Sequence, residues 1–151
     1  MIPGANIPIL LVEDNEDDQL LIERAFVRTQ LRNPLHIVED GETALLYLDG
    51  AAPYADRARF PLPGLILLDL KLPGRSGFDV LQWVRAQPGY VGRTPVVILT
   101  SSAEHPDVSR AYDLHANSYL RKPVLPSDLL TLVEALGRYW FALNEGPPLG
   151  P

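Results

Sequence analysis

Short apolar runs alternate with amphipathic stretches along the chain, and this alternation organises the sequence. Five runs have the length and composition of strands, at residues 7–12, 35–38, 65–68, 95–99 and 118–120. Their starts are roughly 25 to 30 residues apart, which is about the length of one strand–helix unit. The three central runs are apolar at nearly every position, as strands buried on both faces are. The pattern predicts an α/β protein with a doubly wound, five-stranded parallel sheet.

The segments between these runs carry apolar residues at helical spacing. The first predicted helix covers residues 17–29, and Asn15, with Asp18 three residues further on, resembles a capping arrangement. A second helix is expected to open at Asp40 and to end at Gly50, because glycine readily takes the left-handed conformation that closes a helix.

Three later helices and one long loop complete the expected pattern. Ser76 is suited to cap a third helix, Pro106 to stand at the start of a fourth, and Ser127 to cap the last. Residues 49–63 hold three prolines and no helical stripe. They predict a connection longer than the usual two to six residues.

The end of the last helix carries three consecutive aromatic residues, Tyr139, Trp140 and Phe141. One helix cannot point three adjacent side chains at the same core. Part of this aromatic surface is therefore expected to need another partner.

Composition limits the class of protein further. The chain has 151 residues, no cysteine, 13 basic and 19 acidic side chains, and a formal charge of −6. It is expected to form one domain over residues 1–151, with a core at about 7–143, a short tail at 144–151 and no output domain. Disulfides and thiolate metal sites are excluded, and the negative charge disfavours nucleic acid as a partner. No signal peptide or membrane span is recognisable, so a cytoplasmic location is expected.

Carboxylates follow two of the predicted strands. Glu13 and Asp14 end the first strand and Asp69 ends the third. If the strands are wound in the order 2-1-3-4-5, these three side chains converge in one cleft at the carboxyl edge of the sheet. Their mutual repulsion is relieved most simply by a hard divalent cation such as Mg²⁺, which prefers oxygen ligands.

The remaining strand ends supply a hydroxyl, Thr100, and an ammonium, Lys122. Mg²⁺ commonly shares its site with a phosphoryl group, whose oxygens these two side chains suit. Asp69 is then a nucleophile that forms an aspartyl phosphate. Three of these features have a simpler interpretation when taken alone, because acids such as Glu13 and Asp14 favour the first turn of a helix, a lysine is usually a solvated surface charge and a hydroxyl can merely end a strand. Asp69 is stronger evidence, because burying a charge without a partner is costly.

Taken together, these residues resemble the receiver domain of two-component response regulators. The motifs ILLVEDN, LILLDLKLPGRSG, PVVILTSS and YLRKP occur in family order and spacing, and the resemblance covers about residues 7–143. It implies a flavodoxin-like (βα)5 fold and a signalling protein that is no enzyme in the usual sense, since it catalyses only its own phosphorylation and dephosphorylation.

The resemblance also implies roles for individual residues. Asp69 becomes the phosphoacceptor, and Lys122 contacts the phosphoryl group. Glu13, Asp14, Asp69 and the backbone carbonyl of Lys71 hold Mg²⁺, for which Mn²⁺ or Ca²⁺ can substitute. The bond between Lys122 and Pro123 is expected to be cis, as is common in this family.

The implied switch links Thr100 to Tyr119. Thr100 is drawn toward the phosphoryl group, Tyr119 turns inward behind it, and the surface of the fourth helix, the fifth strand and the last helix changes. Ser102 and Lys71 flank the site and are positioned to tune hydrolysis. Glu13 departs from the aspartate that many members carry there.

The long loop and the aromatic end of the chain more narrowly resemble small regulators paired with bacterial phytochrome kinases. This implies a phytochrome-type sensor histidine kinase as phosphodonor, and a homodimer through the switch surface with Trp140 and Phe141. The alternatives are a Mg²⁺-dependent phosphatase, a flavodoxin-type cofactor binder, and an interaction module that takes no phosphate. Lys71 stands where the phosphatase would carry its second acid, and the acidic turn after the first strand disfavours a phosphate cradle.

Overall fold

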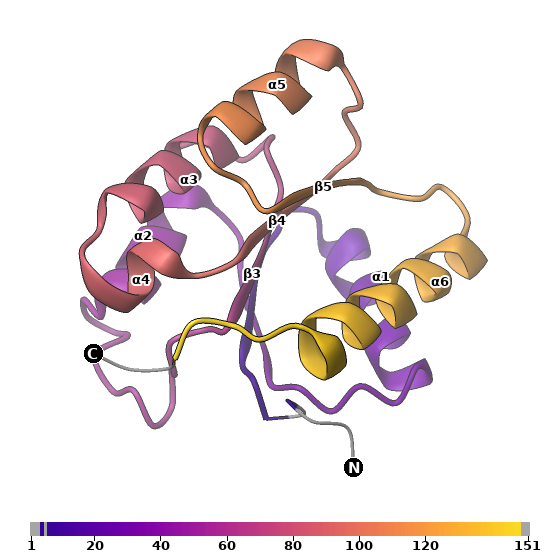
Figure 1. Ribbon diagram of the computed structural model, residues 1–151, viewed down its shortest axis with the longest axis horizontal. Coiled ribbons are helices and arrows are strands. Elements are labelled where there is room, and N and C mark those ends of the chain that lie inside the picture. Colours follow the sequence, from indigo (N-terminus) through magenta and orange to yellow (C-terminus); the bar gives the residue numbers. More distant parts are fainter. Residues whose placement is uncertain (1–3, 5, 149–151) are drawn as a thin grey trace.

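The computed structural model describes residues 4 and 6–148 and shows one parallel sheet between two layers of helices (Figure 1). The strand order is β2-β1-β3-β4-β5, which confirms the predicted winding. The strands are β1 (Ile9–Val12), β2 (Leu35–Val38), β3 (Leu65–Leu68), β4 (Val96–Thr100) and β5 (Ser118–Arg121).

Six α-helices and one π-helical segment follow the strands in the described part of the chain. They are α1 (Glu16–Arg28), α2 (Gly41–Asp49), α3 (Gly77–Ala86), α4 (Gly89–Arg93), α5 (His105–Asp113), α6 (Pro126–Leu136) and η1 (Gly137–Leu143). The short α4 has no counterpart among the predicted helices, because five residues cannot display a periodic apolar stripe. None of the helices formed by residues 4 and 6–148 is long and apolar enough to cross a membrane.

Alternate residues of the strands enter two separate cores. Ile9 and Leu11 of β1 pack with α1 and α6, whereas Leu10 and Val12 pack with α2, α3 and α5. Successive side chains of a strand point to opposite faces, so a strand covered on both faces must be apolar throughout. β1, β3 and β4 are buried at every position, which accounts for their uninterrupted apolar sequences.

Most of the expected helix ends are confirmed. The Asn15 side chain accepts a hydrogen bond from Asp18 N, Ser76 forms a capping box with Asp79, and Gly50 closes α2 with a φ of 72°. Ser127 is not a cap, because α6 begins one residue earlier at Pro126, whose ring already holds a helical φ.

One backbone expectation is wrong. Among the described residues the only cis peptide bond joins Ala52 and Pro53, so the bond between Lys122 and Pro123 is trans.

The predicted long loop before β3 folds back over the end of α2. The Arg57 guanidinium donates hydrogen bonds to the carbonyls of Tyr47 and Leu48 at 2.8 and 3.0 Å. Tyr54 and Phe60 pack against the Tyr47 ring. The Arg57 cation at the carbonyl end of α2 also complements the helix dipole, so the loop caps the end of this helix.

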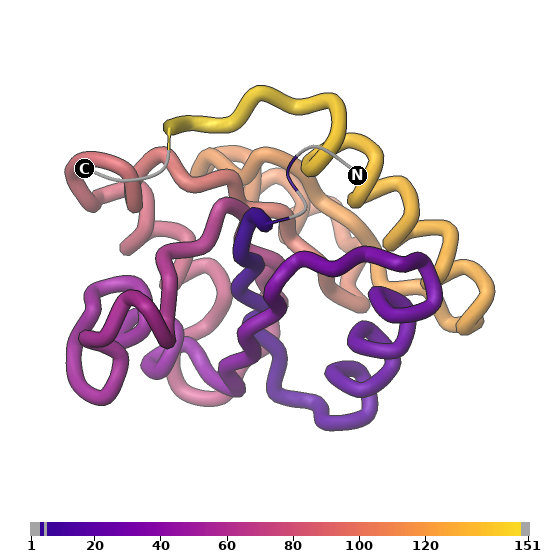
Figure 2. Tube along the Cα trace, turned by 90° about the horizontal axis from the view of Figure 1, so that it is seen from below, coloured from indigo at the N-terminus to yellow at the C-terminus, as the bar shows by residue number. Residues whose placement is uncertain are grey.

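The π-helical turn of η1 decides which aromatic residue enters the core. A π-helix closes hydrogen bonds five residues apart instead of four, so its turn is wider than that of an α-helix and shifts the phase of the side chains that follow. Phe141, five residues after the buried Leu136, is only 3% exposed, while Tyr139 is 52% exposed and Trp140 is partly buried. The expectation that Phe141 lies on an outer surface is therefore wrong, because a regular α-helical phase was assumed. Figure 2 shows that the chain that follows α6 and η1 runs back toward α4.

Candidate functional site

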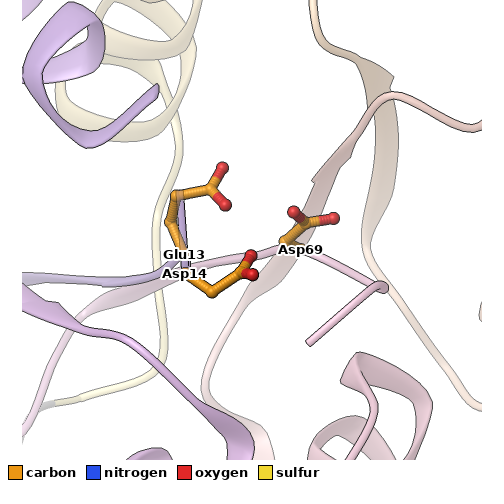
Figure 3. A group of neighbouring side chains, drawn as sticks. All are labelled: Glu13, Asp14 and Asp69. Carbon is orange, nitrogen blue, oxygen red and sulfur yellow. The ribbon is translucent and has the colours of Figure 1, made fainter. Parts of the chain in front are cut away.

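Carboxylates from two adjacent strands meet at the carboxyl edge of the sheet. β1 and β3 pair in parallel with Val12 beside Leu68, so the residues that follow them, Glu13, Asp14 and Asp69, emerge side by side. Each offers an oxygen within 4.8 Å of the others, and Figure 3 shows their three carboxylates around a common space. Glu13 and Asp69 are buried, whereas Asp14 is exposed.

Backbone contacts hold Asp69 in this position. Its N–H donates to the Val12 carbonyl at 3.1 Å, and the Gly77 N–H donates to the Leu70 carbonyl at 2.9 Å. A Cβ atom on Gly77 would lie 2.1 Å from the carbonyl oxygen of Asp69. Only glycine permits α3 to begin this close to the strand end, so the glycine of the GRSG segment fixes the wall beside Asp69.

Lys122 brings positive charge into the carboxylate cluster from the end of β5. Its Nζ atom contacts Glu13 and lies 2.9 Å from Oδ2 of Asp69 and 3.1 Å from Oδ2 of Asp18. Its backbone N–H donates to the Thr100 carbonyl at 2.7 Å, which ties the lysine to β4. The Lys122 side chain is only 15% exposed, so its ion pairs with the buried Glu13 and Asp69 are shielded from solvent and from salt, whereas the pair with Asp18 is partly exposed.

The electrostatics of the cluster follow from burial and proximity. Burial raises the pKa of Glu13 to about 7, the Asp69 charge adds to the rise, and Lys122 opposes it. Burial alone would lower the pKa of Lys122, but its hydrogen bonds to Glu13 and Asp69 outweigh this and raise it. Lys122 is therefore a permanent cation at neutral pH, while Glu13 is easily protonated when no other cation is present.

Thr100 has a buried hydroxyl that lacks a partner. It ends β4, is fully buried, and its Oγ1 makes no hydrogen bond. Buried polar atoms are nearly always satisfied, so an unsatisfied one at a strand end calls for an explanation. A group that arrives beside Thr100 only in another state of the protein would provide one.

A hydrogen-bond chain connects the segment after Thr100 to β5. The Tyr119 hydroxyl donates to the Ser102 carbonyl at 2.8 Å, and the Ser102 hydroxyl donates to Oδ2 of Asp107 at 2.6 Å. Tyr119 thus contacts the segment that connects β4 to α5. Ser102, which was expected beside the site, accepts this hydrogen bond through its carbonyl.

The structure brings Glu13, Asp14 and Asp69 together as the strand order predicted, and Lys122 lies among them. Lys71 donates its N–H to Oδ1 of Asp69 at 3.3 Å. Its carbonyl as a metal ligand, and the individual catalytic roles, stay predictions. Sequence reasoning missed Asp18, which was interpreted through the helix cap alone although its carboxylate reaches Lys122.

The donor set fits a hard divalent cation. Three carboxylates within reach of one another supply the oxygen ligands that Mg²⁺ and Mn²⁺ favour, and the exposed Asp14 leaves a side open for water. Burial is the main cause of the raised pKa of Glu13 and the Asp69 charge adds to it, so a bound cation would favour the ionised carboxylate.

Comparisons with known proteins find the same kind of relative over most of the chain. The family model described as response regulator receiver domain matches residues 9–134. The probable methanogenesis regulatory protein FilR2 of Methanothrix harundinacea is 40% identical over 92% of this chain and 86% of its own length. Response regulator Rcp1 of Synechocystis is 37% identical over 87% of each chain.

Solved structures of similar proteins superpose closely on this one. The phosphorylated cyanobacterial phytochrome response regulator RcpA has a TM-score of 0.87 at 35% identity, covering 95% of this chain and 99% of its own. The Mn²⁺-bound form of Rcp1 has a TM-score of 0.84 at 35% identity over 94% and 99%. The bacteriophytochrome response regulator RtBRR has a TM-score of 0.74 at 43% identity over 95% and 85%.

Proposed function

Because the chain belongs to the response regulator receiver domain family, we propose that it accepts a phosphoryl group on the Asp69 carboxylate and thereby carries a signal. The observation that carries this proposal is the ion pair between Lys122 and Asp69, 2.9 Å long, inside a cluster of three further carboxylates. A buried carboxylate beside a fixed ammonium is a nucleophile next to a ready partner for phosphoryl oxygens.

The transfer step is a displacement at phosphorus. An oxygen of the Asp69 carboxylate attacks the phosphoryl group of a phosphohistidine, an O–P bond forms, and the N–P bond breaks with its electron pair passing to the imidazole nitrogen. Lys122 stabilises charge on the transferring oxygens throughout. In the second half of the cycle, water attacks phosphorus, the bond between phosphorus and the Asp69 oxygen breaks, and inorganic phosphate leaves as the carboxylate is regenerated. The catalysed chemistry is confined to the protein's own aspartate.

Glu13, Asp14, Asp69 and the Lys71 carbonyl are the proposed ligands of Mg²⁺, for which Mn²⁺ or Ca²⁺ can substitute. The oxygen chemistry of the cluster and the Mn²⁺ bound in the Rcp1 structure support this choice. When bound there, the cation supplies positive charge for the developing charge of the transferring group. Glu13, longer by one methylene than an aspartate, keeps its backbone tied to β2 through the hydrogen bond from its N–H to the Val38 carbonyl, 3.0 Å long.

Thr100 and Tyr119 form the proposed switch. A phosphoryl oxygen offers the unsatisfied Thr100 hydroxyl an acceptor, and movement of β4 toward it disturbs the bond between Tyr119 and Ser102. Contacts available in only one arrangement shift the population between two arrangements. The affected surface is formed by α5, β5 and α6, which correspond to the fourth predicted helix, the fifth strand and the last helix.

The proposed phosphodonor is a sensor histidine kinase of phytochrome type. Two of the similar structures are a phytochrome and a bacteriophytochrome response regulator. The surface beside Lys122 also suits a protein donor, because Leu21, Val124 and Leu125 expose apolar area there. Exposed apolar groups that rim a polar site mark a protein-binding surface.

The proposed assembly is a homodimer through the α5–β5–α6 face with Trp140. A groove of about 810 Å³ runs along β5, α6 and η1, and it is lined by Leu120, Leu132 and Trp140 among others. Tyr139 stands at its rim and packs edge-on against Trp140 with ring centroids 4.9 Å apart. Phe141 is buried in the core and is not exposed at this face.

Phosphotransfer from a purified kinase tests the proposal. An autophosphorylated phytochrome-type histidine kinase and an unrelated histidine kinase are each mixed with this protein or with its Asp69→Asn variant, and the label is followed. We expect rapid transfer from the phytochrome-type kinase to the unaltered protein and none to the variant. Equal transfer from both kinases contradicts the proposed donor, and label on the variant contradicts the proposed acceptor.

A further inference from the structure

Asp18 contacts the site from outside the candidate metal cluster. Its Oδ2 lies 3.1 Å from Nζ of Lys122, and its side chain is 36% exposed. Glu13, Asp14 and Asp69 can share one cation, and Asp18 is not a member of that group. The residue belongs to the first turn of α1, and its backbone N–H is held by the Asn15 side chain at 2.9 Å.

The three N–H donors of Lys122 are divided among Glu13, Asp69 and Asp18. The first two are the groups that the proposed function engages elsewhere. Asp69 loses its free carboxylate when it becomes an acyl phosphate, and the Glu13 carboxylate binds the divalent cation. The ammonium keeps one carboxylate that takes no part in this chemistry, which is that of Asp18.

We propose that Asp18 is a positioning residue that anchors the Lys122 ammonium at the site while Glu13 and Asp69 change partners. This inference rests on the proposed function. An unanchored lysine side chain has large rotational freedom, and a fixed carboxylate on its outer side removes it. A divalent cation would also repel the ammonium, and Asp18 opposes that displacement. The contact stabilises the lysine where a phosphoryl oxygen arrives.

Substitution at position 18 leaves the fold of α1 untouched, because the capping bond runs to the backbone of Asp18. The rate constant of phosphorylation by a small acyl phosphate with Mg²⁺ is measured for the unaltered protein and for Asp18→Asn, Asp18→Glu and Asp17→Asn. The last is a matched control, because Asp17 is exposed, adjacent and equal in charge. We expect Asp18→Asn to be about fivefold slower, as for the loss of one partly exposed ion pair, with Asp18→Glu recovering most of the rate and Asp17→Asn unchanged.

The same substitution made together with Lys122→Ala shows whether Asp18 acts through the lysine. We expect Asp18→Asn to cause no further slowing in that background. The urea midpoints of the unaltered protein, Asp18→Asn, Lys122→Ala and the double variant, measured without metal, should show that the effects of the two substitutions on stability are non-additive. Equal slowing in both backgrounds, an effect matched by Asp17→Asn, or a rate above that of the unaltered protein overturns the inference. If the unaltered protein takes no phosphoryl group, the proposed function fails, while the unfolding cycle still decides whether Asp18 and Lys122 are coupled.

Discussion

The hydroxyl of Tyr119 donates a hydrogen bond of 2.8 Å to the backbone carbonyl of Ser102. This bond joins β5 to the segment that follows Thr100, and the Ser102 hydroxyl extends it to Asp107 on α5. Any movement of Tyr119 therefore changes the constraint on the start of α5. The relationship explains how an event beside Thr100 reaches a surface helix.

Tyr119→Phe is expected to loosen the link between β4 and α5 in the unmodified protein. One hydrogen bond is worth roughly 0.5 to 1.5 kcal/mol. Amide hydrogen exchange over residues 101–105 should accelerate by a factor of a few, with little change elsewhere. Tyr112→Phe is the control, since Tyr112 lies on the exposed side of α5. Unchanged exchange in Tyr119→Phe contradicts the proposed connection.

Thr100→Val is expected to stabilise the unmodified protein. The two side chains have the same shape, and valine removes a buried hydroxyl without a partner. The gain in the free energy of unfolding is about 1 kcal/mol, measured by urea titration. Beryllofluoride, which imitates a phosphoryl group, should stabilise the unaltered protein more than this variant.

Thr100→Ser is the matched control, because it retains the hydroxyl. It should keep the response to beryllofluoride while losing some stability to the missing methyl group. A Thr100→Val variant that is destabilised and responds fully would show that the hydroxyl has a partner in the unmodified protein and none in the other state.

The burial of Glu13 predicts an unusual dependence of stability on pH. Its folded pKa, about 7, lies above the ordinary value of 4.5, so the folded protein binds the proton more tightly than the unfolded chain. Stability from this group is present below about pH 4.5 and is lost as pH rises to about 7. Without divalent cations, the free energy of unfolding should fall across this range relative to Glu13→Gln. Parallel pH profiles of the two proteins would contradict the raised pKa.

Trp140→Ala is expected to weaken the proposed homodimer. Trp140 lines the groove beside β5 and α6, and a large aromatic residue at the centre of an interface commonly carries much of its binding energy. Light scattering should give a dimer mass for the unaltered protein and a lower mass for the variant. Val27→Ala, which removes exposed apolar area from α1, should leave the mass unchanged. A monomer mass for the unaltered protein contradicts the dimer.

The sequence predicts the strands from local signals, and the carboxylate cluster follows once the strand order is assumed. Uninterrupted apolar runs mark β1, β3 and β4, and the strand order places Glu13, Asp14 and Asp69 at one edge. Helix caps such as Asn15 and Ser76 are equally local. These features could be inferred without knowledge of how the helices pack.

The features that escaped prediction depend on packing over long separations or on a change of helical phase. Asp18 and Lys122 are 104 residues apart and meet only because α1 lies beside the end of β5. Phe141 enters the core because η1 widens the helical turn, which a regular period does not foresee. Ser102 accepts from Tyr119 through its backbone, so its side chain gave no indication of the bond.

The role of Asp69 as phosphoacceptor is tested by the intact mass of the protein after incubation with a small acyl phosphate, with and without Mg²⁺, alongside Asp69→Asn. We expect a Mg²⁺-dependent gain of one phosphoryl group by the unaltered protein and no gain by the variant. A protein that gains nothing under conditions that preserve acyl phosphates, or a variant that gains as much, would contradict the assignment of Asp69 as phosphoacceptor.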